Sequence, residues 1–208
     1  GSTNMAVTSN ARDGTSSREI FLKSAKKLFE ERGYRRTTMQ QIADNAELHV
    51  QTLYRHFPNK SSLAKTIEMD RLQSAFAQRE GSTLELWRNF VERSTVEMLG
   101  MPQGEEKLLS FVNYDSKDPS LSAAWLEISD AYREELARGI AQDLGLDRYR
   151  NHLPIFIASM LWLGNRDVVF QWVATGGHGD LLPKVLGVVD KVQEIVEILV
   201  QEPENFSR

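Results

Sequence analysis

Apolar residues recur at helical spacing along almost the whole chain, and this pattern constrains the fold more than any other feature. Side chains at i, i+3, i+4 and i+7 share one face of an α-helix. The sequence shows none of the alternating apolar and polar runs, bounded by turn residues, that indicate strands. It therefore predicts an all-α protein of about nine helices.

Two capping boxes mark where the first helices begin. Ser16 is followed three residues later by Glu19, and Gly33 ends the helix that they open. Thr38 and Gln41 repeat the pattern at the start of a helix of about two turns. The side chains at these positions bond backbone N–H groups that the first helical turn leaves without partners.

A third short helix follows a tight turn. Val50, Leu53 and Phe57 repeat at helical spacing with their side chains turned inward, and Pro58 ends the segment. Two helices this short are not stable alone, so they need each other and the first helix. The pattern predicts a helix-turn-helix within a three-helix domain over residues 16–70.

The outward side of the third helix carries groups that suit base edges in the DNA major groove. These residues are His49, Gln51, Thr52, Arg55 and His56. Gln pairs well with adenine, Arg pairs with guanine, and a Thr or Val methyl meets the thymine methyl. Hydroxyls, amides and lysines at the margins suit phosphates, and the candidates for that role are Thr37, Thr38, Tyr54 and Lys60. The alternatives are an ordinary solvated helix face and a Tyr54 that belongs to the core.

Charge is divided unevenly along the chain. Residues 1–70 hold 11 Lys or Arg against 8 Asp or Glu, a balance of +3, while residues 71–208 hold 14 against 21, a balance of −7. A basic head on an acidic body is expected when only the head meets a polyanion such as double-stranded DNA. Chance asymmetry is the alternative.

The run from Arg18 to Leu63, with LFEERGYRRTTMQQIA and then TLYRHFPNK, resembles the DNA-binding domain of the TetR family of bacterial transcriptional regulators. The resemblance implies a homodimer that binds a palindromic operator, usually to repress, and releases it when a small molecule enters the carboxy-terminal domain. By position it implies that Thr38, Tyr54, His56 and Lys60 contact phosphates. It likewise implies that His49, Val50, Gln51, Thr52 and Arg55 face the bases.

Two residues depart from the family pattern, which usually has a glycine-containing turn followed by serine. Glu47 stands where glycine reaches the required turn conformation without strain, and it adds negative charge near the phosphates. His49 is a weaker N-cap than serine. The operator preference is therefore hard to predict from the resemblance.

Residues 71–208 predict a larger helical domain for effector binding and dimerisation. The helix over about residues 152–175 is apolar nearly all round, and a broad valine stripe follows it. This surplus predicts that the last two helices pack against a second copy in a four-helix interface. The expected interface residues are Val168, Trp172, Val185, Val189, Val192 and Val196. The alternative is a buried central helix in a monomer.

The expected effector is a small apolar or amphipathic molecule. Asn165, Arg166 and Asp167 interrupt an apolar helix, so at least one of them is expected to face the interior, where it would pair with another side chain, the second subunit or a ligand. The pocket candidates are Trp87, Phe90, Phe111, Trp125, Met160, Trp162, Asn165 and Arg166. Such aromatic residues can equally be plain core.

The sequence argues against an enzyme. None of the four histidines has metal-ligand spacing, and the chain has no Walker loop, nucleophile elbow or dinucleotide fingerprint, so no metal or cofactor is expected. The competing functions are a helix-turn-helix dimer without a small-molecule effector, controlled by a protein partner, an activator, and an all-α enzyme whose helix-turn-helix merely packs.

The location expected for this chain is the cytoplasm. It has no cysteine, which suits a reducing compartment, and no run approaches the roughly 18 consecutive apolar residues of a membrane span. Residues 1–15 read as an expression scar followed by a disordered polar tail without an export leader.

Overall fold

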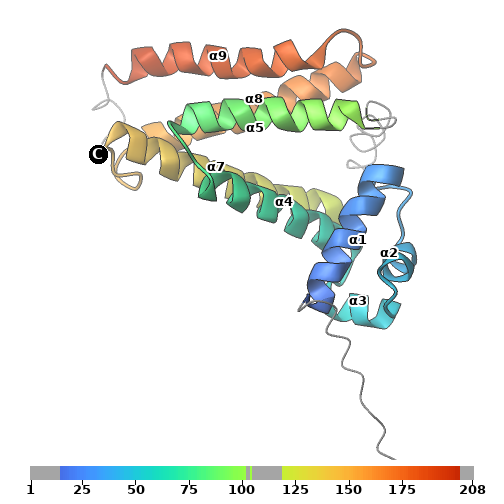
Figure 1. The fold of residues 1–208 in the computed structure, drawn as a ribbon. Coiled ribbons are helices and arrows are strands. Elements are labelled where there is room, and N and C mark those ends of the chain that lie inside the picture. The colour runs from blue at the N-terminus through green and yellow to red at the C-terminus, as the bar shows by residue number, and fades with distance from the viewer. Residues whose placement is uncertain (1–14, 102–103, 105–118, 202–208) are drawn as a thin grey trace, which may run out of the picture.

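The computed structural model describes residues 15–101, 104 and 119–201. Within these ranges the chain forms eight helices and no strand, which confirms the all-α prediction (Figure 1). The pocket candidate Phe111 lies outside the described residues, as do residues 1–14 of the predicted tail.

Three short helices and the start of a fourth form one end of the molecule: α1 (Ser17–Arg32), α2 (Met39–Ala46), α3 (Val50–His56) and α4 (Lys60–Ala77). Their shared N-terminal cluster is built around Phe21, Ile42 and Leu53, each 0% exposed. Both bonds of the Thr38 and Gln41 capping box are present. At the start of α1, the N–H of Glu19 donates to Ser16 Oγ over 3.2 Å.

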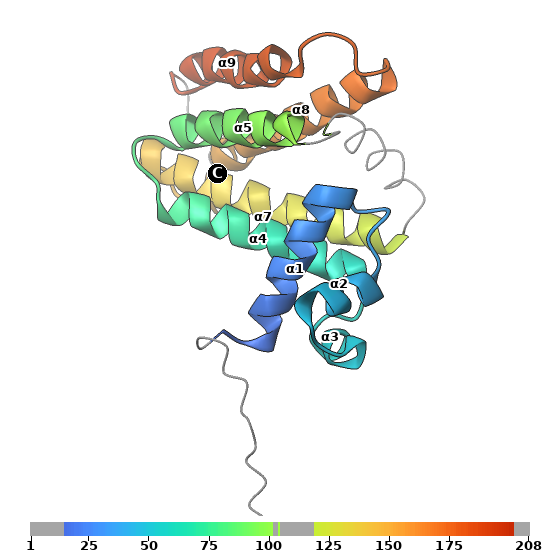
Figure 2. The ribbon, with the colours of Figure 1, turned by 45° about the vertical axis from the view of Figure 1, so that its right-hand side comes forward.

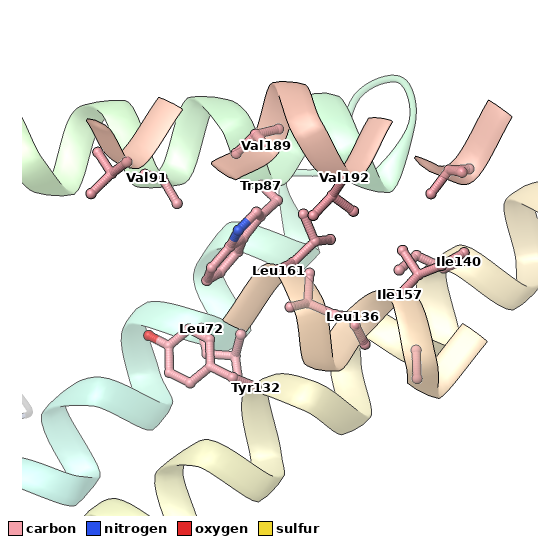
Figure 3. Packing of buried hydrophobic residues seen from close by; sticks show 14 of the residues in the cluster. Leu72, Trp87, Val91, Tyr132, Leu136, Ile140, Ile157, Leu161, Val189 and Val192 are labelled. Atoms are coloured by element: carbon pink, nitrogen blue, oxygen red, sulfur yellow. The ribbon is translucent and has the colours of Figure 1, made fainter. Parts of the chain in front are cut away.

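The larger part of the chain consists of α5 (Thr83–Gly100), α7 (Pro119–Leu144), α8 (Leu153–Ala174) and α9 (Leu181–Leu199). In this body α8 packs against α7 and α9, α5 packs against α9, and α4 packs against α7 (Figure 2). Trp87, Leu136, Ile157 and Leu161 lie at the centre of the body cluster, the main hydrophobic core (Figure 3).

The helix α4 belongs to both clusters. Leu63 and Ile67 pack in the N-terminal cluster, whereas Met69 and Leu72 pack in the body cluster. The change from one core to the other therefore happens on one continuous helix, between Ile67 and Met69. A tilt of α4 relative to the body moves the whole N-terminal end with it.

By length and hydropathy alone, α8 is long and apolar enough to cross a membrane. Core helices of proteins in water pass the same test. Leu153, Ile157 and Leu161 on α8 are each 0% exposed inside the body cluster, so one side of this helix is a core face.

Candidate functional site

The helix α3 lies at the end of the molecule opposite α9 (Figures 1 and 2), and most of its polar residues are exposed. Leu53 and Phe57 are 0% and 3% exposed and fix the helix on the N-terminal cluster. The exposed α3 residues are Gln51, Tyr54, Arg55 and His56, and His49 is exposed just before the helix. This face can enter a groove without disturbing the packing behind it.

Two predicted base-contacting residues are only half-buried. Val50 packs at the edge of the N-terminal cluster, so it offers part of its side chain to solvent. The hydroxyl of Thr52 accepts a hydrogen bond from Nη2 of Arg55 over 3.3 Å. This bond holds the Arg55 guanidinium along the surface of α3.

The turn between α2 and α3 confirms the prediction about Glu47. Glu47 is left-handed, with φ 56° and ψ 38°, and it is the one residue other than glycine with positive φ among those described. The N–H groups of Glu47 and Leu48 donate to the carbonyls of Asp44 and Ala43 over 3.0 and 3.1 Å. These two bonds form a Schellman motif, in which glycine is the usual residue at the left-handed position. After the turn, His49 caps α3 without a side-chain hydrogen bond.

The predicted phosphate anchors fall into different environments. Tyr54 is 51% exposed, so it is available to DNA and is not a core residue. His56 is exposed beside Phe21 and Phe57. Thr38 caps α2 from an exposed position, where its hydroxyl accepts from the N–H of Gln41 over 3.1 Å.

Thr37 does not fit the role that the sequence predicted for it. Its side chain is 1% exposed, and its hydroxyl bonds the carbonyls of Leu28 and Gly33 over 3.2 and 2.8 Å. A hydroxyl has one proton to donate, so this group is committed to joining α1 to the loop before α2. The correction is that Thr37 is a structural residue.

Lys60 ties the same loop to the start of α4. Its ammonium donates to the carbonyl of Tyr34 over 2.7 Å and lies 4.3 Å from the centre of the Tyr34 ring. The cation therefore has a fixed position at the margin of the N-terminal end.

The expected dimer residues lie mostly inside the single chain. Trp172, Val185, Val189, Val192 and Val196 are 1–9% exposed and belong to the body cluster. The valine stripe of α9 faces its own chain because α5 and α8 cover it. The indole N–H of Trp172 donates to the carbonyl of Gly179 over 3.1 Å. Trp172, Val185, Val189 and Val196 are corrected to core. Val192 is buried but also lines a groove between α8 and α9, and Val168 is half-buried.

The outer faces of α8 and α9 instead form an open, apolar groove of about 630 Å³. Its apolar lining includes Phe156, which is 52% exposed, Leu163, which is 38% exposed, and Val188. The groove is shallow at Gly164 because this glycine lets the two helices approach, and a Cβ there would lie 2.8 Å from a methyl of Val188.

Three of the predicted pocket aromatics meet in one place, and Tyr132 joins them. The indole of Trp87 lies 5.4 Å from Phe90, 6.0 Å from Tyr132 and 6.0 Å from Trp162 between ring centres. Tyr132 stacks on Trp162 at 4.3 Å. These four residues, from α5, α7 and α8, are called the aromatic cluster below.

The other pocket candidates lie apart from one another. Met160 lines the outer groove, and Trp125 packs at the edge of the body cluster. Arg166 lies over the ring of Phe170, 4.8 Å from its centre. Of the polar trio on α8, Asp167 is exposed, while Asn165 is half-buried with its side-chain oxygen enclosed. None of the ion pairs found among residues 15–101 and 119–201 involves this trio.

Polar residues at the edge of the aromatic cluster connect it to α4 through a network that the sequence did not predict. The hydroxyl of Tyr132 donates to a Glu68 carboxylate oxygen over 3.2 Å, and Arg71 pairs with the same carboxylate over 3.1 Å. Arg71 also donates to Ser94 on α5 over 2.8 Å and lies over the ring of Phe90. Tyr132 is 1% exposed on its helix, and helical spacing within α7 cannot show its partner on α4.

Burial and charge determine the protonation of these groups. Burial raises the pKa of Tyr132 above its ordinary value, and the Glu68 carboxylate raises it further. The hydroxyl therefore keeps the proton that it donates. Burial lowers the pKa of Arg71, but the charge of Glu68, its hydrogen bond with Arg71 and the charge of Glu97 outweigh that effect and raise it overall.

A family profile and two known proteins resemble this chain in sequence. The sequence profile of a family described as "Bacterial regulatory proteins, tetR family" matches residues 21–67. The chain is 28% identical over 163 residues to the HTH-type transcriptional regulator TcmR of Streptomyces glaucescens, which covers 74% of this chain and 72% of that protein. It is 24% identical over 191 residues to the HTH-type transcriptional repressor AcnR of Corynebacterium diphtheriae, which covers 90% and 96%.

A solved structure shares the fold. Thermus thermophilus FadR, a TetR-family transcriptional repressor in complex with lauroyl-CoA, superimposes with a TM-score of 0.56 at 19% identity, over 85% of this chain and 93% of that one. At 19% identity this similarity shows only that the two proteins share an arrangement of helices.

Proposed function

Because the chain belongs to the TetR family of bacterial transcriptional regulators, we propose that it is a ligand-responsive repressor that binds a palindromic operator and releases it when an effector enters the body. The observation that carries the proposal is the α2–α3 unit, which presents a polar helix face on a buried support. Binding and releasing an operator needs no catalytic residue. The proposed location of the regulator is the cytoplasm, where the operator lies.

Residue roles follow from exposure. Gln51, Thr52 and Arg55 read base edges together with His49 and the exposed part of Val50. Thr38, Tyr54, His56 and Lys60 hold phosphates around the groove and set the register of α3. Residues 16–70 serve as the DNA-binding domain and residues 71–208 as the effector and dimer domain, joined through α4.

The dimer forms through the open groove between α8 and α9. Its apolar surface includes Phe156 and Leu163, and two-fold packing would bury it in a four-helix interface. Two copies then place two α3 helices in successive major grooves, about 34 to 36 Å apart. Replacing Leu163 by Glu is expected to give a monomer in light scattering. A Leu163→Glu protein that stays dimeric would locate the interface elsewhere.

The DNA-binding proposal is tested by selecting sites from random duplex DNA. The expected result is a palindrome whose half-sites are about one helical turn apart. A pool that is never enriched, at low as well as moderate salt, would refute the proposal. For the effector, linkage requires operator DNA and ligand to weaken each other's binding by the same factor. Equal ligand affinity with and without saturating operator would exclude release at equilibrium.

A further inference from the structure

The aromatic cluster contains buried polar atoms that lack partners. The indole nitrogens of Trp87 and Trp162 and the side-chain oxygen of Asn165 are enclosed, and none of them has a hydrogen-bond partner among the described residues. Trp87 is 1% exposed, so solvent does not replace the missing partner. Buried indole N–H groups usually find an acceptor, and each exception calls for an explanation.

These atoms lie in one neighbourhood. Trp87 and Trp162 are 6.0 Å apart between ring centres, and Asn165 follows Trp162 by three residues on α8, so both side chains lie on neighbouring positions of one helix face. Figure 3 shows Trp87 and Tyr132 side by side within the body cluster. The cluster thus combines flat apolar rings with two donors and one acceptor.

The charges at the edge of the aromatic cluster further restrict the class of ligand that can bind there. Glu68 already accepts from Tyr132 and pairs with Arg71, so its carboxylate is occupied. The guanidinium of Arg71 lies 5.5 Å from the centre of the Phe90 ring. A cationic ligand would meet this positive charge, and the carboxylate of Glu68, which holds Arg71 and Tyr132, is not free to balance it.

We propose that the aromatic cluster is the effector-recognition site and that it selects a planar, non-cationic aromatic compound bearing carbonyl and hydroxyl groups. This inference rests on the proposed function, because it names the ligand class for the effector of that regulator. Ligand oxygens accept from the indoles of Trp87 and Trp162, and a ligand hydroxyl donates to Asn165. The ligand rings take over stacking contacts that the side chains now make with one another, such as the 4.3 Å stack of Tyr132 on Trp162.

The test uses 1,8-dihydroxyanthraquinone as the probe, with ethidium as a planar cation and lauric acid as a flexible chain. Binding to the full chain is measured by calorimetry and by quenching of tryptophan fluorescence. The anthraquinone is expected to saturate one site per chain and to bind at least about tenfold more tightly than either comparison compound. Failure of the anthraquinone to bind, or equal binding of ethidium, would overturn the assignment of ligand class.

Variants locate the site. Trp162→Phe keeps a ring but removes one donor, and Asn165→Leu removes the acceptor, so each is expected to weaken anthraquinone binding about fivefold. Trp172→Phe is the matched control, because the indole of Trp172 already donates to Gly179 away from the cluster. Its affinity is expected to stay within about twofold of the wild type. Unchanged affinity in both Trp162→Phe and Asn165→Leu would place the ligand elsewhere.

A parallel operator measurement separates the two proposals. A protein that selects a palindrome but ignores the anthraquinone contradicts only the ligand class. A protein that binds the anthraquinone but never enriches DNA contradicts only the proposed function.

Discussion

Replacing Glu47 by Gly tests whether the turn between α2 and α3 stores strain. Glu47 has φ 56° and ψ 38°, a left-handed conformation that costs a residue with a Cβ about 1 to 2 kcal/mol. Glycine avoids this cost but loses about 0.5 to 1 kcal/mol more conformational entropy on folding. The net expectation is that Glu47→Gly stabilises the protein by about 0.5 to 1 kcal/mol, or about 2 °C in melting temperature for a chain of this size.

The measurement is chemical denaturation of the wild type, Glu47→Gly and Glu47→Gln. The glutamine variant keeps the strain and removes only the charge, so its stability should match the wild type. On operator DNA, both variants should bind about twofold more tightly at low salt, since both remove a negative charge near the phosphates. Stabilisation by glutamine as large as that by glycine would show that charge, and not backbone strain, limits this turn.

Further substitutions probe packing, the network on α4 and the DNA contacts. Gly139→Ala places a Cβ 2.4 Å from the hydroxyl of buried Thr83, so it should destabilise by about 1 to 3 kcal/mol in denaturant titrations, whereas Gly100→Ala, which meets nothing within 4 Å, should not. Tyr132→Phe removes the bond to Glu68 and should cost about 1 to 1.5 kcal/mol at pH 7. Because the folded-state pKa of Tyr132 is raised, its hydroxyl stabilises the fold fully below the unfolded value of about 10, and this advantage over phenylalanine should shrink as pH rises above that value. Equal stability of the two proteins at pH 7 would mean that the bond to Glu68 contributes nothing. Arg55→Ala should cost about 1 to 3 kcal/mol on the best operator and relax preference at one base pair, while Lys60→Ala should weaken all sequences alike and make the salt slope shallower by about one. Identical sequence profiles for the two variants would contradict their separate roles.

Local chemistry made the N-terminal end predictable. The Thr38 and Gln41 capping box, the inward Leu53 and Phe57, and the strained Glu47 all follow from interactions within a few residues of the chain. Thr37 is the exception, because its hydroxyl bonds Leu28, nine residues away, and a neighbouring threonine with the same side chain caps a helix instead.

The body was less predictable because its decisive contacts join distant residues. The valine stripe of α9 predicted a buried face, but only the packing of α5 and α8 shows that the same chain covers this face and leaves a separate outer groove open. Tyr132, for example, donates to a Glu68 carboxylate that lies 64 residues away in the sequence, and helical spacing cannot show such a contact.

By itself the sequence determined the helices, their caps and the exposed polar face of α3, since periodicity and capping act over one or two turns. Only the tertiary structure decided which apolar faces the chain covers itself, and which core indole and amide atoms, such as those of Trp87 and Asn165, have no hydrogen-bond partner among the described residues. A side chain is buried by the elements that pack on it, and in this body those elements are helices far apart in the sequence.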